Sequence, residues 1–190
     1  MGMYVNPGNS GFAGIRNDAY VDKSGLIRRV QESDRLIEDT IHGNAEAVAA
    51  QIEKIHAEEA PLHYNSEQSL RSVIKRAYFS CGDEYVLFEE LPAGVGYADM
   101  IYLPKRDSQL PALVIELKWN QTAKGAVEQI KDRCYPEVIR TYGGEILMVG
   151  INYDKEVSAG RRRHTCVIEK WQAQSDDAEF RRRNHKLIIV

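Results

Sequence analysis

The stretch GYADMIYLPKRDSQLPALVIELKWN, residues 96–120, decides how this chain folds. It contains two apolar runs, rich in the β-branched and aromatic residues that are typical of strands, around a polar segment with a proline at each end. Such runs predict two core strands. Asp99, Glu116 and Lys118 interrupt these runs, where burying an unpaired charge is costly.

Side chains alternate along a strand, so Glu116 and Lys118 are predicted to share one face of the second run. If the two runs pair as a hairpin, Asp99 lies beside Glu116. Two carboxylates in a poorly solvated place repel each other unless a cation lies between them. Carboxylate oxygens suit Mg²⁺ or Mn²⁺, and a nearby lysine can hold a water and balance charge on a phosphate. The pattern predicts a metal site for phosphodiester hydrolysis, although an E-x-K string alone usually marks a solvated salt bridge.

The overall composition is that of one globular domain. The 190 residues are 43% hydrophobic and 28% charged, with a formal net charge of -3, which gives no general attraction to nucleic acid. The three cysteines are widely spaced and favour neither a disulfide framework nor a structural zinc site. Without a long apolar run or the features of a signal peptide, we expect a cytoplasmic protein with no membrane partner.

The hydrophobic periodicity predicts an α/β fold. Two short antiparallel helices are expected between residues 26 and 59, with a break at Gly43-Asn44, and a third helix after the capping pair Asn65-Ser66. Strands are predicted at 84–91, 97–103 and 111–118, with PAGVG as a turn, then a helix over 122–141 despite its proline, and strands at 144–153 and 163–171. This order predicts a mixed sheet flanked by helices. The final KLIIV fits either a closing strand or an exposed apolar end.

The GYAD and ELK strings resemble the PD-(D/E)XK nuclease superfamily, with Asp99, Glu116 and Lys118 at its D, E and K positions. The resemblance implies a restriction-endonuclease-like core in the order αβββαβ, with an N-terminal helical extension. The stretches YNSEQSL, ELPAGVGYADMIYLP, PALVIELKWN, AVEQIKDRCYPEVI and GEILMVGINYD are closer still to the nuclease domain at the C-terminus of AAA-ATPase-like bacterial proteins.

This resemblance divides the chain into four parts. Residues 1–27 resemble the start of the ATPase-like region, 28–61 form a helical lead-in, 62–171 form the nuclease-like domain, and 172–190 form a tail. The phosphate-loop motif G-x-x-x-x-G-K-[ST] does not occur in the sequence. We therefore expect no nucleotide-binding residues, no ATP as a partner and no ATP hydrolysis.

The resemblance also implies roles for residues outside the D, E and K positions. Gln129 would support the catalytic group, the backbone carbonyl of Leu117 would be a metal ligand, and Glu67 would add a metal contact. Tyr135 would contact nucleic acid. Each also has a plain structural interpretation: Gln129 as a surface residue, Glu67 as an acid favoured in a first helical turn, and Tyr135 as a core residue. The run Arg161, Arg162 and Arg163 is either a phosphate-binding surface or a solvated face.

The sequence therefore predicts a Mg²⁺- or Mn²⁺-dependent nuclease, with Asp99, Glu116, Lys118 and Gln129 as catalytic residues and DNA favoured over RNA as the substrate. The alternative is a catalytically weak or inactive nuclease-fold module that binds nucleic acid or a protein. A third hypothesis is a homodimer formed by the helices at 28–60 and the KLIIV end.

Overall fold

Five strands form a single mixed sheet in a computed structural model that describes residues 24–58, 66–93, 96–105, 108–139, 144–157 and 161–171. The strands are β1 (Tyr85–Ala93), β2 (Gly96–Pro104), β3 (Ala112–Trp119), β4 (Ile146–Tyr153) and β5 (His164–Lys170). They lie in sequence order across the sheet. Only β3 and β4 are parallel, and the other neighbours are antiparallel. The predicted mixed sheet is confirmed.

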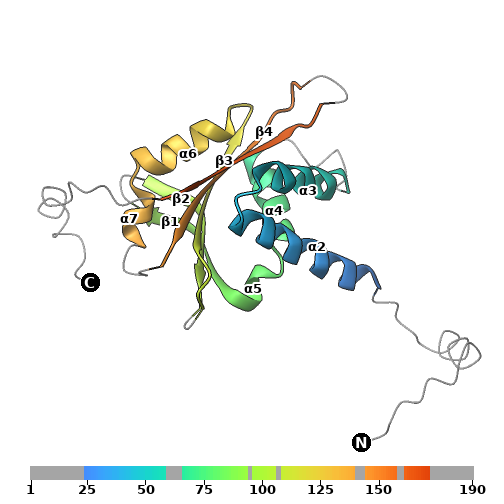
Figure 1. Cartoon of the computed structure of the whole chain (residues 1–190). Coiled ribbons are helices and arrows are strands. Elements are labelled where there is room, and N and C mark those ends of the chain that lie inside the picture. The colour runs from blue at the N-terminus through green and yellow to red at the C-terminus, as the bar shows by residue number, and fades with distance from the viewer. Residues whose placement is uncertain are drawn as a thin grey trace, which may run out of the picture.

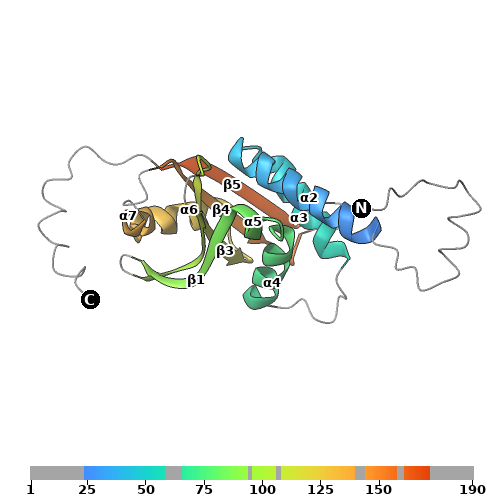
Figure 2. The ribbon, with the colours of Figure 1, turned by 90° about the horizontal axis from the view of Figure 1, so that it is seen from below.

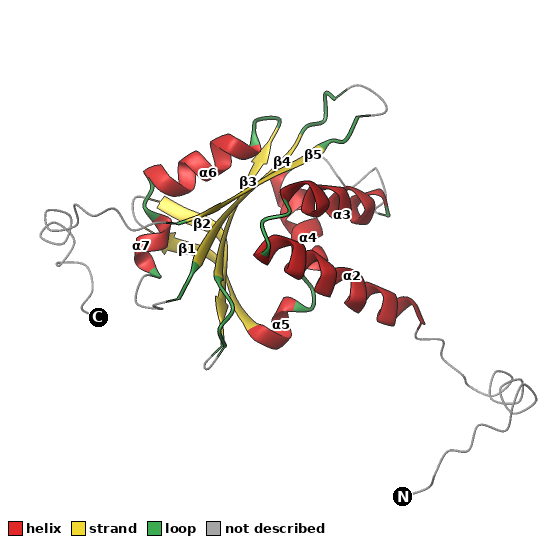
Figure 3. Ribbon diagram, viewed as in Figure 1, coloured by secondary structure: helices red, strands yellow, loops and turns green. Residues whose placement is uncertain are grey.

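Helices cover both faces of the sheet (Figure 1, Figure 3). One face carries α2 (Ser24–Ile41), α3 (Ala45–Ala57) and α4 (Glu67–Ala77), and the short α5 (Cys81–Glu84) leads into β1. The other face carries α6 (Ala123–Asp132), which connects the parallel strands, and the short α7 (Tyr135–Val138). The view from below separates these two groups of helices (Figure 2).

Two apolar cores hold these layers together. On the α2–α4 face, Leu36, Ile52 and Leu70 are fully buried against odd-numbered residues of β3 and β4. On the α6 face, Val127 and Ile130 pack over even-numbered residues of the same strands. Both faces of the central strands are therefore covered, which explains their nearly continuous apolar runs.

The helical extension packs directly on the nuclease-like core. Val48 and Ile52 of α3 belong to the same buried cluster as the sheet residues. The break between α2 and α3 falls at Gly43, whose φ of 76° suits a glycine. The division of the chain at residues 27 and 61 remains a prediction, since residues 1–23 and 59–65 lie outside the described residues.

The helix predicted over 122–141 is interrupted. It divides into α6 and α7, and Cys134 between them has a left-handed φ of 55°. Ser66 caps α4 as predicted, because its hydroxyl accepts a hydrogen bond from the Ser69 N–H. The PAGVG turn is described only in part, and KLIIV lies outside the described residues. Within the described ranges, no helix has the length and apolar character needed to cross a membrane.

Candidate active site

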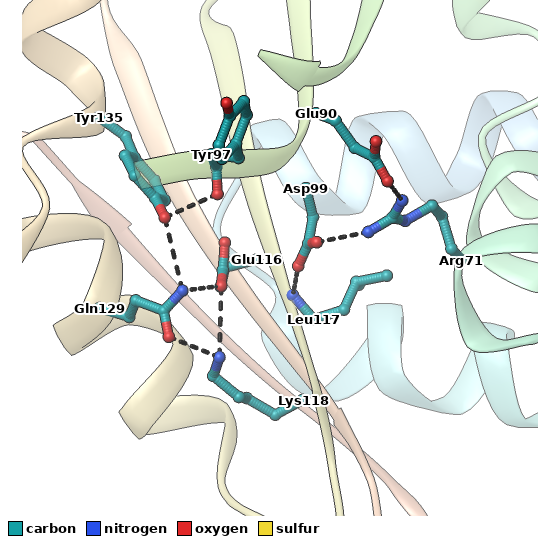
Figure 4. Close-up of polar contacts among 9 residues, drawn as sticks. All are labelled: Arg71, Glu90, Tyr97, Asp99, Glu116, Leu117, Lys118, Gln129 and Tyr135. Carbon is teal, nitrogen blue, oxygen red and sulfur yellow. Dashed lines mark hydrogen bonds and ion pairs between the residues drawn. The ribbon is translucent and has the colours of Figure 1, made fainter. Parts of the chain in front are cut away.

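The candidate site lies where β2 and β3 separate. Their antiparallel pairing ends at Met100 with Ile115, so the register places Asp99 opposite Glu116 at the next position. The Asp99 carboxylate there accepts a hydrogen bond from the backbone N–H of Leu117, with 2.9 Å between Oδ2 and N. A side chain thus replaces the partner strand, and both carboxylates lie at the gap (Figure 4).

The pleat of β2 is also interrupted at this point. Ala98 and Ile101 both belong to the buried cluster under α6, although strict alternation would place them on opposite faces. Strict alternation would place Asp99 on the same face as Ile101, but its carboxylate contacts Arg71 of α4, which covers the other face. The physical reason is the loss of the strand pairing, which lets Asp99 turn toward the α4 side of the sheet.

Glu116 is the most constrained group in the site, with an exposed fraction of only 3%. Its Oε1 accepts hydrogen bonds from the Lys118 ammonium, at 3.3 Å, and from the Gln129 amide. Its Oε2 is buried and has no hydrogen-bond partner among the described residues. Burial, and then the negative charge of Asp99, raise the pKa of Glu116 to about 7.

Lys118 is held between two acceptors. Its Nζ donates to the side-chain oxygen of Gln129 at 2.6 Å and to Glu116 at 3.3 Å. Gln129 comes from α6, so this helix fixes the position of the ammonium group. The Gln129 amide nitrogen lies 3.5 Å from the Tyr135 hydroxyl, which donates to the backbone oxygen of Tyr97 at 2.7 Å. The chain of contacts joins α6, α7, β2 and β3 (Figure 4).

A glycine lets α6 approach the sheet closely enough for these contacts. Gly150 of β4 is paired with Glu116 of β3. A Cβ atom at Gly150 would lie 2.1 Å from the backbone oxygen of Ala123 and 2.9 Å from a methyl group of Val127, both in α6. Any larger residue would push α6 away from the sheet and take Gln129 with it.

An arginine that the sequence analysis did not select completes the site. Arg71 of α4 donates from Nη2 to Asp99 Oδ1 at 2.6 Å and from Nη1 to Glu90 at 2.7 Å. Burial alone would lower the pKa of Arg71, but its hydrogen bonds to Glu90 and Asp99 raise it above its ordinary value. The signal in the sequence is the position of Arg71, next to the apolar stripe of α4 and one helical turn after Glu67.

Glu90 supports this arginine from an unusual backbone conformation. It lies in the middle of β1, where the pairing with β2 skips Glu90 and Asp99, and it has a φ of 50°. A residue other than glycine or asparagine rarely adopts this left-handed region, which costs on the order of 1 kcal/mol or more. The conformation is thus another irregularity of the sheet beside Asp99.

The structure brings four of the predicted residues together, namely Asp99, Glu116, Lys118 and Gln129. Leu117 lies among them, with its N–H on Asp99. Tyr135 is fully buried and lies against Gln129, and its contact with nucleic acid remains a prediction.

The other predicted residues lie outside this group. Glu67 is exposed in the first turn of α4, and no contact with either carboxylate is described. The arginine run precedes β5, where Arg162 pairs with Glu46 of α3 and Arg163 donates to the Tyr153 hydroxyl at 3.3 Å.

The donor set fits a small, hard cation. Among the described residues, no group of three or more His, Cys, Asp or Glu side chains converges on one point. A cation at this site would therefore have Asp99, Glu116 and backbone oxygen as protein ligands and would keep several waters, as Mg²⁺ commonly does. The buried and unpartnered Oε2 of Glu116 is the oxygen that such a cation would satisfy.

A mixed sheet with two carboxylates and a lysine at a strand separation defines a nuclease-like α/β protein. Residues 65–159, half of the chain, match the family profile described as the PD-(D/E)XK nuclease superfamily, and the chain belongs to that superfamily. A search of curated proteins finds no match to this chain. The fold agrees with the restriction-endonuclease-like architecture, and members of the superfamily are generally nucleases that commonly use divalent metals.

Proposed function

We propose that this protein is a divalent-metal-dependent nuclease that hydrolyses phosphodiester bonds of nucleic acid, DNA before RNA. The observation that carries the proposal is the buried Oε2 of Glu116, which lacks a partner beside the second carboxylate, Asp99. An acceptor of this kind costs stability and is retained most simply as a ligand for a cation. The superfamily membership supports the same class of reaction.

Each residue of the site has a role in this proposal. Asp99, Glu116 and the Leu117 carbonyl would hold Mg²⁺ or Mn²⁺, which when bound supplies a Lewis acid for the phosphate and a more acidic water. Lys118 lies close enough to Glu116 to hold a water beside it and to balance negative charge as the phosphate is attacked. Gln129 keeps the ammonium in place through its 2.6 Å hydrogen bond.

A cleavage panel tests the proposal. Linear double-stranded, circular and single-stranded DNA, with matching RNA, would be incubated with the protein in Mg²⁺, Mn²⁺ or EDTA. We expect cleavage of at least one substrate in Mn²⁺ or Mg²⁺, no cleavage in EDTA, and none by Asp99→Asn. Cleavage that persists in EDTA, or equal cleavage by Asp99→Asn, would contradict the assignment of the site.

A second function is favoured by one observation, the ion pair between Arg71 and Asp99. A site whose first carboxylate is neutralised by the protein itself suits a module that binds nucleic acid or a protein without cutting. The same panel separates the two functions, because such a module would bind oligonucleotides equally with and without Mn²⁺ and would leave every substrate intact.

The wider context of the protein is part of the proposal. The sequence resemblance supports a bacterial, cytoplasmic protein related to AAA-ATPase-like chains, with nucleic acid and not ATP as its partner. A homodimer through the helices at residues 28–60 and the KLIIV end is the remaining hypothesis for assembly, and the mass of the protein in solution tests it.

A further inference from the structure

The guanidinium of Arg71 holds one of the two Asp99 oxygens that a bound cation would use. Its guanidinium bridges Asp99 and Glu90 at 2.6 and 2.7 Å, and its side chain and that of Asp99 have exposed fractions of only 20% and 13%. Asp99 therefore has both oxygens engaged, one by Arg71 and the other by the Leu117 N–H. A metal ion that uses Asp99 has to compete with Arg71 for the outer oxygen.

The two sides of Asp99 leave complementary groups without partners. On one side, the Oε2 of Glu116 is a buried acceptor with none among the described residues. On the other side, the Nε of Arg71 is a buried donor that also has no hydrogen-bond partner among the described residues. A metal ion would satisfy the acceptor, and a phosphate oxygen would satisfy the donor. A phosphodiester with a bound metal ion carries both of these groups, one positive and one negative.

We propose that Arg71 is a substrate-binding residue that pairs with Asp99 in the metal-free protein and transfers to a phosphate of the nucleic acid when a divalent cation takes Asp99. This inference rests on the proposed metal site. Glu90 keeps the guanidinium beside the gap during the exchange, since the contact at Nη1 does not involve Asp99. Arginine suits this role because its fork of donors binds carboxylate and phosphate in the same geometry.

The same helix and strand provide a matched control. Lys75 of α4 pairs with Glu89 of β1 at 3.0 Å, one helical turn from Arg71, and both side chains are about half exposed. This ion pair joins the same two elements as the one between Arg71 and Glu90, but it does not include Asp99. A general effect of removing a charge between α4 and β1 would therefore appear equally in Lys75→Met.

Mn²⁺ titration of the full chain by calorimetry gives a readout independent of cleavage. We expect Arg71→Met to bind Mn²⁺ about tenfold more tightly than the wild type, because no ion pair has to be broken. Lys75→Met should bind as the wild type does. Arg71→Lys, which cannot bridge both carboxylates, should fall between, and thermal melting of each variant verifies that it is folded.

Oligonucleotide binding tests the second half of the exchange. In the Lys118→Ala background, which prevents cleavage, adding Arg71→Met should weaken Mn²⁺-dependent binding of a short DNA by about tenfold, and adding Lys75→Met should change it by no more than about twofold. Tighter metal binding together with weaker DNA binding is the combined result expected only of a competing substrate-binding arginine.

The outcomes separate this inference from the proposed function. If Mn²⁺ binds the wild type and binds Arg71→Met with the same or lower affinity, Arg71 is a structural ion pair and the inference is overturned alone. Unchanged DNA binding by the Arg71 variant would overturn the transfer to phosphate. If neither protein binds Mn²⁺, the metal site and the inference both fail.

Discussion

Glu116 of β3 and Glu53 of α3 each have a basic side chain beside them, yet their surroundings shift the two pKa values in opposite directions. Glu53 of α3 accepts hydrogen bonds on Oε2 from the backbone N–H groups of Arg163 and His164 and from His164 Nδ1 at 2.5 Å. Burial alone would raise the pKa of Glu53, but the hydrogen bonds from His164 lower it below its ordinary value. Glu116 has a raised pKa and an oxygen without a described partner.

The difference indicates what each carboxylate does. Glu53 links α3 to the start of β5, where His56, Tyr153 and His164 also pack ring to ring, so it has the surroundings of a stabilising residue. Glu116 has one oxygen bonded to Lys118 and Gln129 and one oxygen without a described partner, which suits a ligand for a cation. A buried polar group without a partner is rare in folded proteins, and a catalytic role or a bound ion is one of its explanations.

The largest expected effect is the loss of cleavage when Asp99 is changed, with no comparable loss when Glu53 is changed. Asp99→Asn should reduce the rate of cleavage by at least about 10²-fold, because it removes a negative ligand and the charge that binds the cation. Glu53→Gln should keep the rate within about threefold, since Glu53 contacts none of the four candidate catalytic residues. Initial rates in Mn²⁺ measure both variants. A comparable loss in Glu53→Gln would show that the two centres are not separate.

The next effect concerns how the close approach of α6 to the sheet positions Gln129 beside Lys118. Gly150→Val should displace α6 and weaken the contact of Gln129 with Lys118, with about a tenfold or larger loss of rate and about 1 to 3 kcal/mol of stability. Gly82→Ala is the control, because a Cβ there meets nothing within 4 Å. Rates and thermal melting are measured together. A Gly150→Val protein with the wild-type rate would mean that Gln129 does not depend on the close approach of α6.

The comparison also shows what the sequence could and could not predict. The strands and their mixed pairing follow from apolar runs, which are local properties. The proximity of Asp99 to Glu116 follows from the antiparallel register of β2 and β3, although side-chain alternation fails at Asp99. Arg71 and Glu90 are not predictable in this way, because the contacts of Arg71 with Glu90 and Asp99 depend on where α4 lies relative to β1 and β2. The break at Cys134 precedes Tyr135, which is buried and donates a hydrogen bond to the backbone oxygen of Tyr97, a long-range contact that helix propensity does not predict.

Smaller effects are expected on the free energy of unfolding, with opposite signs for Glu116→Gln and Glu53→Gln. In EDTA at pH 8, Glu116→Gln should stabilise the protein by about 1 to 2 kcal/mol, because the wild type must bury a charge. The rise in the pKa of Glu116 from 4.5 to about 7 sets an upper limit of about 3 kcal/mol on this gain. Glu53→Gln should destabilise it by about 1 kcal/mol, discounted for the solvent that reaches a third of that side chain. Urea unfolding measures both.

The pH dependence of these two variants sharpens the contrast. A carboxyl whose pKa is raised on folding contributes stability below its ordinary pKa and loses it as pH rises toward the folded value. The gain in Glu116→Gln should therefore become much smaller as the pH is lowered from 8 to 5. The pKa of Glu53 is lowered on folding, so its contribution is present above its ordinary pKa of 4.5 and is lost only in more acidic solution. Parallel pH profiles for the two variants would contradict the comparison.

The smallest expected effect tests whether the surroundings of Glu53 are only structural. Arg161 is exposed just before β5, and each phosphate contact by such a residue releases a counterion. If the arginine run binds nucleic acid, Arg161→Ala should weaken DNA binding about two- to threefold and lower the slope of log affinity against log salt by about 1. Lys54→Ala, an exposed cation of α3 paired with Glu32, is the control. Equal salt slopes in the wild type and both variants would mean that the surroundings of Glu53 only stabilise the fold. A change confined to Arg161→Ala would mean that the nucleic-acid surface extends from the site at Asp99 toward the start of β5.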